Sequence, residues 1–178
     1  MSRIPRVMAV SAALLLALST NARAQDGFRV GYTDLGAVIG LGNIGGASVS
    51  IGGRFERAIK VLPSMGNGVL GIQASVDWWR YSTGFGDWSW FPISATANYH
   101  FQVEGGKIDP FLGLGLGMWI VSAPDCGPVD CSYSSGVYFV GRAGIRYFFS
   151  PAMALYADAG AGASTFNVGL VFKLAGGQ

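Results

Sequence analysis

Eight charged residues recur at alternate positions of apolar segments, a spacing that would let them form ion pairs. Successive side chains of a β-strand point to opposite faces, so a charged residue between apolar neighbours lies on the other face. The set comprises four acids and four bases: Asp34, Glu56, Asp77 and Asp158, with Arg54, Arg142, Arg146 and Lys173. If these faces enclose one interior, we expect the charges to pair and plug it. A gated conduction path is the alternative.

Two cysteines, Cys126 and Cys131, lie close together in a loop predicted over residues 124–135. In an exported chain, this spacing predicts a disulfide that makes the loop rigid. A metal site is not predicted, because two cysteines are too few ligands and the one histidine, His100, is assigned to the opposite end of the molecule.

Catalytic and nucleotide-binding patterns are weak. A base such as His100 needs a nearby nucleophile and an orienting acid, so we interpret it as an interior histidine bonded to its neighbours. Gly40–Gly45 matches G-x-G-x-x-G, yet no helical pattern follows it. We therefore predict no catalytic residue, no cofactor and no enzymatic activity.

Tryptophans gather beside the loops predicted over residues 83–89 and 124–135. Rings that are apolar with one polar edge suit the boundary between lipid and water. An aromatic belt at this rim is the prediction, and a platform that stacks a ligand is the alternative. The five residues are Trp78, Trp79, Trp88, Trp90 and Trp119.

Eight segments with period-two alternation must position these residues. In the fifth, Leu112, Leu114 and Leu116 alternate with glycines whose face leaves interior volume for Arg142 and Arg146. A tilted β-strand crosses a membrane in roughly 9–11 residues, and an eight-stranded barrel is just wide enough for side chains to fill. The sequence thus predicts an all-β, eight-stranded antiparallel up-and-down transmembrane β-barrel. Its strands are expected over 32–41, 47–59, 69–82, 91–101, 108–121, 136–149, 154–160 and 165–174.

The first 24 residues have the layout of a secretory signal peptide. Arg3 and Arg6 precede an apolar run over residues 7–18, and Ala22-Arg23-Ala24 forms the cleavage pattern. Residues 25–31 are predicted as a lead-in, 32–174 as the barrel and 175–178 as a tail. Cleavage would leave nine basic and ten acidic residues, a balance that does not favour nucleic-acid binding.

An even number of strands places both termini on the same side, which in bacterial outer-membrane barrels is the periplasm. The turns near 60–68, 104–107 and 150–153 are then periplasmic. Those near 42–46, 83–89, 124–135 and 161–164 are external.

Three segments resemble the small eight-stranded outer-membrane barrels of the OmpX and OmpA transmembrane-domain type: Gly52–Glu56, Asp109–Gly115 and Gly141–Phe148. The resemblance implies an outer-membrane location in contact with lipid, insertion by the barrel-assembly machinery and a plugged lumen. It also implies a role in envelope stability, adhesion or surface recognition, with any extracellular ligand held by the external loops. We expect a monomer. Family members usually end on phenylalanine, so the assembly signal here would be internal, at Phe172 or Leu174.

Three other classes of protein are alternatives. Lipid A deacylases of the PagL type use a His-x-Ser pair, whereas this chain has His100-Phe101-Gln102 and lacks the nucleophile. A narrow channel for small solutes or ions is a second class. A soluble lipocalin-like binder is the third, and it is disfavoured because the apolar face must lie outside if the charges lie inside.

Overall fold

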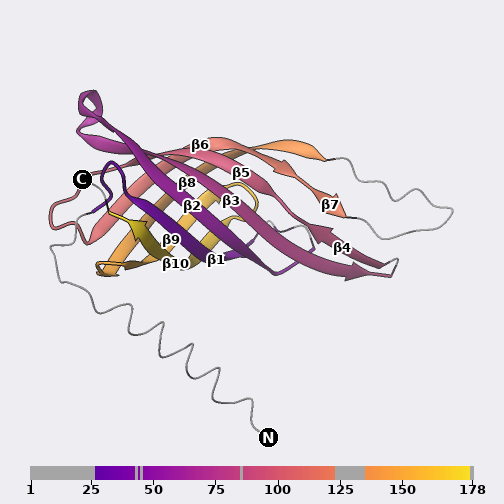
Figure 1. Cartoon of the computed structure of the whole chain (residues 1–178). Helices are drawn as coiled ribbons and strands as arrows, with labels where there is room; N and C mark the ends of the chain where they lie inside the picture. Colours follow the sequence, from indigo (N-terminus) through magenta and orange to yellow (C-terminus); the bar gives the residue numbers. More distant parts are fainter. Residues whose placement is uncertain (1–26, 43, 45, 85, 123–134, 177–178) are drawn as a thin grey trace, which may run out of the picture.

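The described residues form ten β-strands (Figure 1). The computed structural model describes residues 27–42, 44, 46–84, 86–122 and 135–176. The predicted signal peptide, Cys126 and Cys131 lie outside the described residues. The strands are β1 Thr33–Leu41, β2 Val49–Leu62, β3 Gly68–Thr83, β4 Gly86–Trp90, β5 Ile93–His100, β6 Ile108–Trp119, β7 Val121–Ser122, β8 Gly136–Ser150, β9 Met153–Ala161 and β10 Phe166–Ala175.

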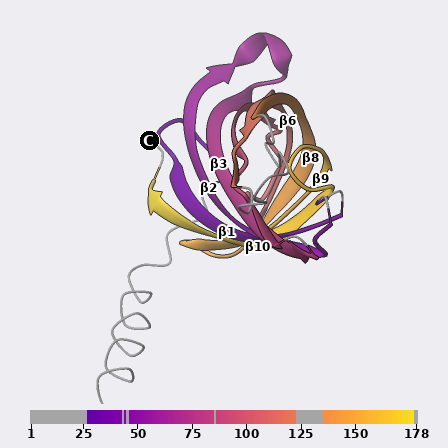
Figure 2. The ribbon, with the colours of Figure 1, turned by 90° about the vertical axis from the view of Figure 1, so that its right-hand side faces the viewer.

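Eight of these strands close into a barrel in chain order: β1, β2, β3, β5, β6, β8, β9 and β10. Every pairing is antiparallel, and closure is made by β1, in which Val38 faces Gly52 of β2 on one side and Gly169 of β10 on the other. Figure 2, which looks toward one end of the barrel, shows the ring of strands. The predicted eight-stranded up-and-down barrel is confirmed.

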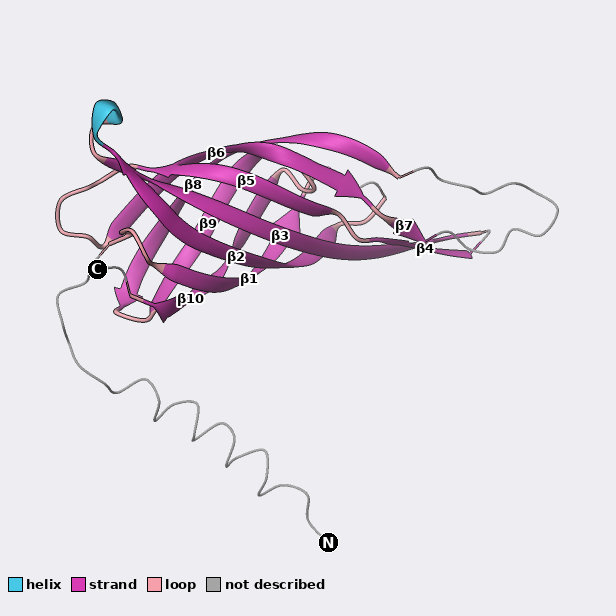
Figure 3. Cartoon of the chain, turned by 45° about the horizontal axis from the view of Figure 1, so that its top comes forward, coloured by secondary structure: helices cyan, strands magenta, loops and turns pink. Residues whose placement is uncertain are grey.

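The last part of β3, with β4 and β7, extends one side of the barrel beyond the other strands (Figures 1 and 3). The sequence predicted a loop over 83–89, but β3 continues to Thr83 and turns directly into β4, with Trp79 facing Trp90. β4 and β5 are separated by Phe91 and Pro92, where proline has no N–H to donate. The Phe91 N–H still donates to the Ile120 carbonyl at 2.8 Å, and the Pro92 carbonyl accepts from Asp77 N–H at 2.9 Å. The predicted fifth strand likewise ends at Trp119 and resumes as β7.

Burial alternates along the strands in the sense opposite to that of a water-soluble protein. The outward side chain of Leu114 is 63% exposed, whereas Arg146 is fully buried. Large apolar side chains cover the outside of the wall on all eight barrel strands. Among the described residues, no helix is long and apolar enough to span a membrane.

The connection between β2 and β3 spans residues 63–67. It contains a 3-10 helix, Pro63–Met65, drawn in cyan in Figure 3. Gly66 and Asn67 have φ of 80° and 60°, and such left-handed conformations favour glycine and asparagine. The Tyr99 hydroxyl donates a hydrogen bond to the Met65 carbonyl and holds the turn against the wall.

The exposed β3–β4 hairpin contains a local ion pair. Hydrogen bonds from Ser82 and Arg80 hold the pKa of Asp87 below its ordinary value. This pairing stabilises the hairpin above the unfolded pKa of the carboxyl, and the contribution is lost as pH falls through the lowered folded pKa. We expect an NMR titration to show the lowered pKa and Ser82→Ala to raise it. An unchanged pKa in this variant would contradict the assignment.

Candidate functional site in the barrel interior

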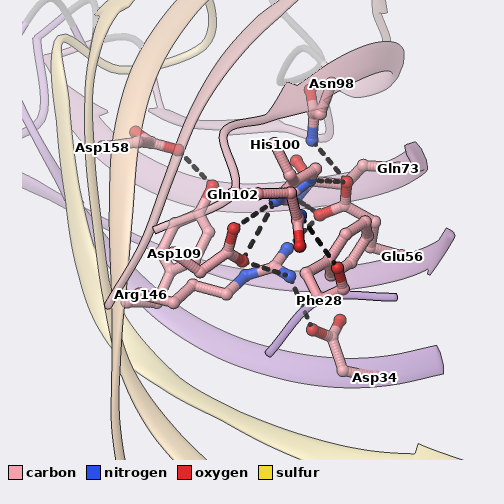
Figure 4. A network of polar contacts seen from close by, with 11 residues as sticks. Phe28, Asp34, Glu56, Gln73, Asn98, His100, Gln102, Asp109, Arg146 and Asp158 are labelled. Atoms are coloured by element: carbon pink, nitrogen blue, oxygen red, sulfur yellow. Dashed lines mark hydrogen bonds and ion pairs between the residues drawn. The ribbon is translucent and has the colours of Figure 1, made fainter. Parts of the chain in front are cut away.

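Arg146 of β8 is the centre of a buried charge network (Figure 4). Its guanidinium contacts Asp34 of β1 at 3.2 Å, Asp109 of β6 at 3.5 Å and Glu56 of β2. Arg146 and Glu56 are fully buried, and the two aspartates are nearly so. Strand alternation explains the convergence, because all four residues lie on inward faces at one level of a closed wall.

His100 of β5 bridges two of these carboxylates. Its Nε2 lies 2.8 Å from Glu56 Oε1, and its Nδ1 lies 2.9 Å from Asp109 Oδ1. Asn98 and Gln73 donate further hydrogen bonds to Glu56, of 2.9 and 3.1 Å. With both ring nitrogens engaged and no exposed surface, His100 is held inside the network.

Aromatic rings close the network at the end of the barrel where β1 begins. Phe28, in the segment before β1, stacks on His100 with ring centroids 3.6 Å apart. The Arg146 Cζ atom lies 5.0 Å from the centroid of the Phe28 ring and 5.6 Å from that of Phe111. Tyr32 packs against Phe28 at 5.0 Å. The segment predicted as a lead-in therefore contributes directly to the interior.

We expect Phe28→Ala to lower the free energy of unfolding by about 2–3 kcal/mol, since a desolvated cation–π contact alone is worth about 2 kcal/mol or more. Urea titration in detergent micelles measures the change. Val30→Ala is the matched control, because Val30 lies in the same segment with an exposed side chain. Equal midpoints for the two variants would show that Phe28 does not seal the network.

A second charged layer lies between the Arg146 network and the end bearing β4 and β7. Arg54 donates to Asp77 at 2.9 Å, and Arg142 pairs with Asp158. Asn167 adds a hydrogen bond of 2.8 Å to Asp158. These residues border a polar cavity of about 20 Å³, which is room for about one water molecule.

The structure brings seven of the eight predicted charged residues together in ion pairs within the interior: Asp34, Arg54, Glu56, Asp77, Arg142, Arg146 and Asp158. Lys173 differs, since it is half-buried and its Nζ lies 5.5 Å from the centroid of the Tyr32 ring. It forms no ion pair with a described residue. Sequence reasoning missed Asp109, although this residue shares the inward parity of Gly113 and Gly115.

The tryptophans differ from the predicted belt. Trp79 and Trp90 are buried inside the wall and stack with centroids 5.9 Å apart, and the Trp119 ring meets both edge-on. Trp88, half-buried, stacks on a neighbouring tyrosine of β3. Trp78 has the outward-facing ring, 38% exposed. The inward tryptophans narrow the interior at this end of the barrel.

Within the described part of the chain, no group of three or more His, Cys, Asp or Glu residues is arranged to hold a metal ion. The interior combines ion pairs, hydrogen bonds and packed rings, an arrangement that fills and stiffens a barrel.

Comparison with solved structures gives three informative matches. OprG of Pseudomonas aeruginosa matches with a TM-score of 0.58 and 10% identity over 84% of this chain and 99% of that one. Ail of Yersinia pestis, in complex with the heparin analogue sucrose octasulfate, matches at 0.51 and 13% over 80% and 97%. The N-terminal β-barrel domain of Pseudomonas aeruginosa OprF matches at 0.50 and 15% over 82% and 98%. No protein-family model and no curated protein matches the sequence. What this chain shares with the three structures is their fold.

Proposed function

We propose that this chain, whose fold is that of the small eight-stranded outer-membrane barrels, lies in an outer membrane as a plugged, non-enzymatic barrel. One observation carries the proposal: the outside of the wall is apolar while the inside is charged and ion-paired. An outward charge near the midplane of a bilayer costs roughly 2–4 kcal/mol, so this distribution suits lipid. Insertion by the barrel-assembly machinery, a monomeric state and periplasmic termini belong to the same proposal.

The plugged interior favours a structural or recognition role over transport. Two layers of ion pairs cross the lumen, and the cavity bordered by the second layer admits about one water molecule. Phe28 and the inward tryptophans add aromatic layers toward the two ends.

Surface recognition would use the extension formed by β3, β4 and β7, because it projects beyond the rest of the wall. Ail is a protein solved with a sulfated sugar analogue. Here the charged side chains described on the extension are Arg80 and Asp87, which pair with each other. A highly charged partner is therefore not favoured by these residues, and contact through aromatic rings and strand edges fits them better.

Membrane fractionation with surface proteolysis tests the proposed location. We expect the full chain in outer-membrane fractions, resistant to extraction, with cleavage from outside confined to the external loops. Migration on denaturing gels should shift on heating. Recovery as a soluble periplasmic monomer would overturn the proposal.

Planar-bilayer recording separates a plugged barrel from a narrow channel. The purified protein is expected to give no steady unit conductance, because ion pairs fill the lumen. A porin reconstituted in parallel controls for incorporation. A reproducible unit conductance that disappears in the same preparation after heat denaturation would support the channel instead.

A further inference from the structure

An apolar groove of about 720 Å³ lies on the outward face of the wall, over β10, β1, β2 and β3. The floor of the groove is one row of outward residues that pair across the four strands: Leu170, Ala37, Gly53 and Val76. The two central members of the row are small, so the wall is hollowed between larger neighbours.

Large apolar side chains border this groove. Ile39, Ile51 and Trp78 occupy the adjoining row toward the end with the β4 extension, and Phe172 lies on the β10 side. Each of these side chains is exposed on the outside of the barrel. The shape and chemistry of the groove fit a flexible hydrocarbon chain.

Two cations lie on β2, one of the strands that form the groove. Arg57 and Lys60 of β2 are exposed and form no ion pair with a described residue, in contrast to Arg80, which pairs with Asp87. Arg57 is outward-facing, since it shares the parity of Gly53 and Phe55 and pairs with the exposed Ile72. Lys60 pairs with Leu70 beyond the bulge in β2.

The spacing along β2 connects the cations to the groove. Arg57 follows Gly53 by four residues, a distance of about 13 Å along a strand. One leaflet of a bilayer contributes about 15 Å of hydrocarbon, half of a core about 30 Å thick. A lipid whose phosphate lies at Arg57 can therefore extend an acyl chain past Phe55 into the groove.

We propose that the outward face of β1 and β2 binds one anionic phospholipid, with its phosphate at Arg57 and Lys60 and an acyl chain in the groove at Ala37 and Gly53. The inference rests on the proposed membrane location. A cation on the lipid face near the interface is mildly unfavourable, and the phosphate offsets that cost by charge pairing.

Native mass spectrometry of the purified full chain tests this site, with phosphatidylglycerol and phosphatidylcholine as the probes. Wild type is expected to retain phosphatidylglycerol at least tenfold more strongly. The double variant Arg57→Gln/Lys60→Gln should lose this preference, and Gly53→Leu should weaken retention of both lipids. Space permits the leucine, since a Cβ at Gly53 would meet only Val76 Cγ1, at 3.6 Å.

Matched controls are Arg80→Gln, which removes a cation near the other rim, and Ala97→Leu, which enlarges a small outward residue on β5. Both should bind as wild type does. Trp78 gives a second readout, because brominated phosphatidylglycerol should quench fluorescence more than brominated phosphatidylcholine, and Trp78→Phe should abolish the difference.

Equal retention of the two lipids by wild type, or equal loss in the groove and control variants, would overturn the site. The site would also be overturned if the wild type formed dimers in place of a lipid-bound monomer and Gly53→Leu dissociated those dimers. Heat-modifiable migration of every variant keeps these outcomes distinct from failure of the barrel to enter a membrane.

Discussion

Replacing Arg146 with methionine is expected to lower the free energy of unfolding by about 3–5 kcal/mol, because removal of one partner leaves buried charges uncompensated. The substitution removes the cation shared by Asp34, Glu56 and Asp109. Urea titration in detergent micelles, followed by heat-modifiable migration, measures the loss. Arg146→Lys should also destabilise, because an ammonium lacks the planar fork of donors that can contact several carboxylates at once.

Lys173→Met is the control, since Lys173 is half-buried and outside the described ion pairs; its effect should remain below about 1 kcal/mol. Neutralising one acid, as in Glu56→Gln/Arg146→Met, should recover part of the stability by reducing the uncompensated charge. If Arg146→Met unfolds at the wild-type urea concentration, Arg146 does not organise the interior.

Gly115→Leu is expected to block or severely impair folding, whereas Leu114→Val should cost less than about 1 kcal/mol. A Cβ at Gly115 would lie 2.0 Å from the Ala95 carbonyl oxygen and 2.7 Å from Thr96 Cα. These are backbone atoms of the paired strand β5, so relief requires the wall itself to move, at a cost of about 1–3 kcal/mol or more. Leu114 faces outward, where a shorter side chain leaves no sealed cavity.

The yield of folded barrel on refolding into lipid vesicles measures this difference. Gly53→Ala is the matched small substitution, because its Cβ has only an ordinary contact at 3.6 Å. Equal yields for Gly115→Leu and Leu114→Val would mean that the inward and outward faces of β6 have been exchanged. The tight neighbour at Gly115 is backbone, which differs from the predicted need to leave room for Arg142 and Arg146.

Strand alternation in the sequence predicted the fold well because inside and outside differ so strongly in this chain. Apolar residues at Leu112, Leu114 and Leu116 define one face without reference to any other strand. The same parity predicted inward positions for Arg54, Arg142 and Arg146. A shift of one residue in a strand's register would move all of its charges to the outside. The face of each charged residue is therefore fixed once the apolar face of its strand is known.

Other parts of the interior depend on contacts that alternation does not encode. Phe28 precedes the first strand, and its role depends on meeting His100 from a distant segment. The inward position of Asp109 was not predicted. This residue lies beside Pro110 at the start of the strand, before the leucines whose alternation identified that strand. Strand β4 was too short to recognise, and the inward placement of Trp90 depends on its pairing with Trp79.

Nitroxide accessibility in lipid vesicles tests most directly the central claim that the apolar face contacts lipid. Labels would be placed singly on the outward Phe139→Cys and Ile145→Cys, and on the inward Val140→Cys, after serine replacement of Cys126 and Cys131. The outward labels are expected to collide more often with dissolved oxygen than with an aqueous nickel complex, while the inward label is protected from both. Ready access of the nickel complex to positions 139 and 145 would contradict a membrane barrel.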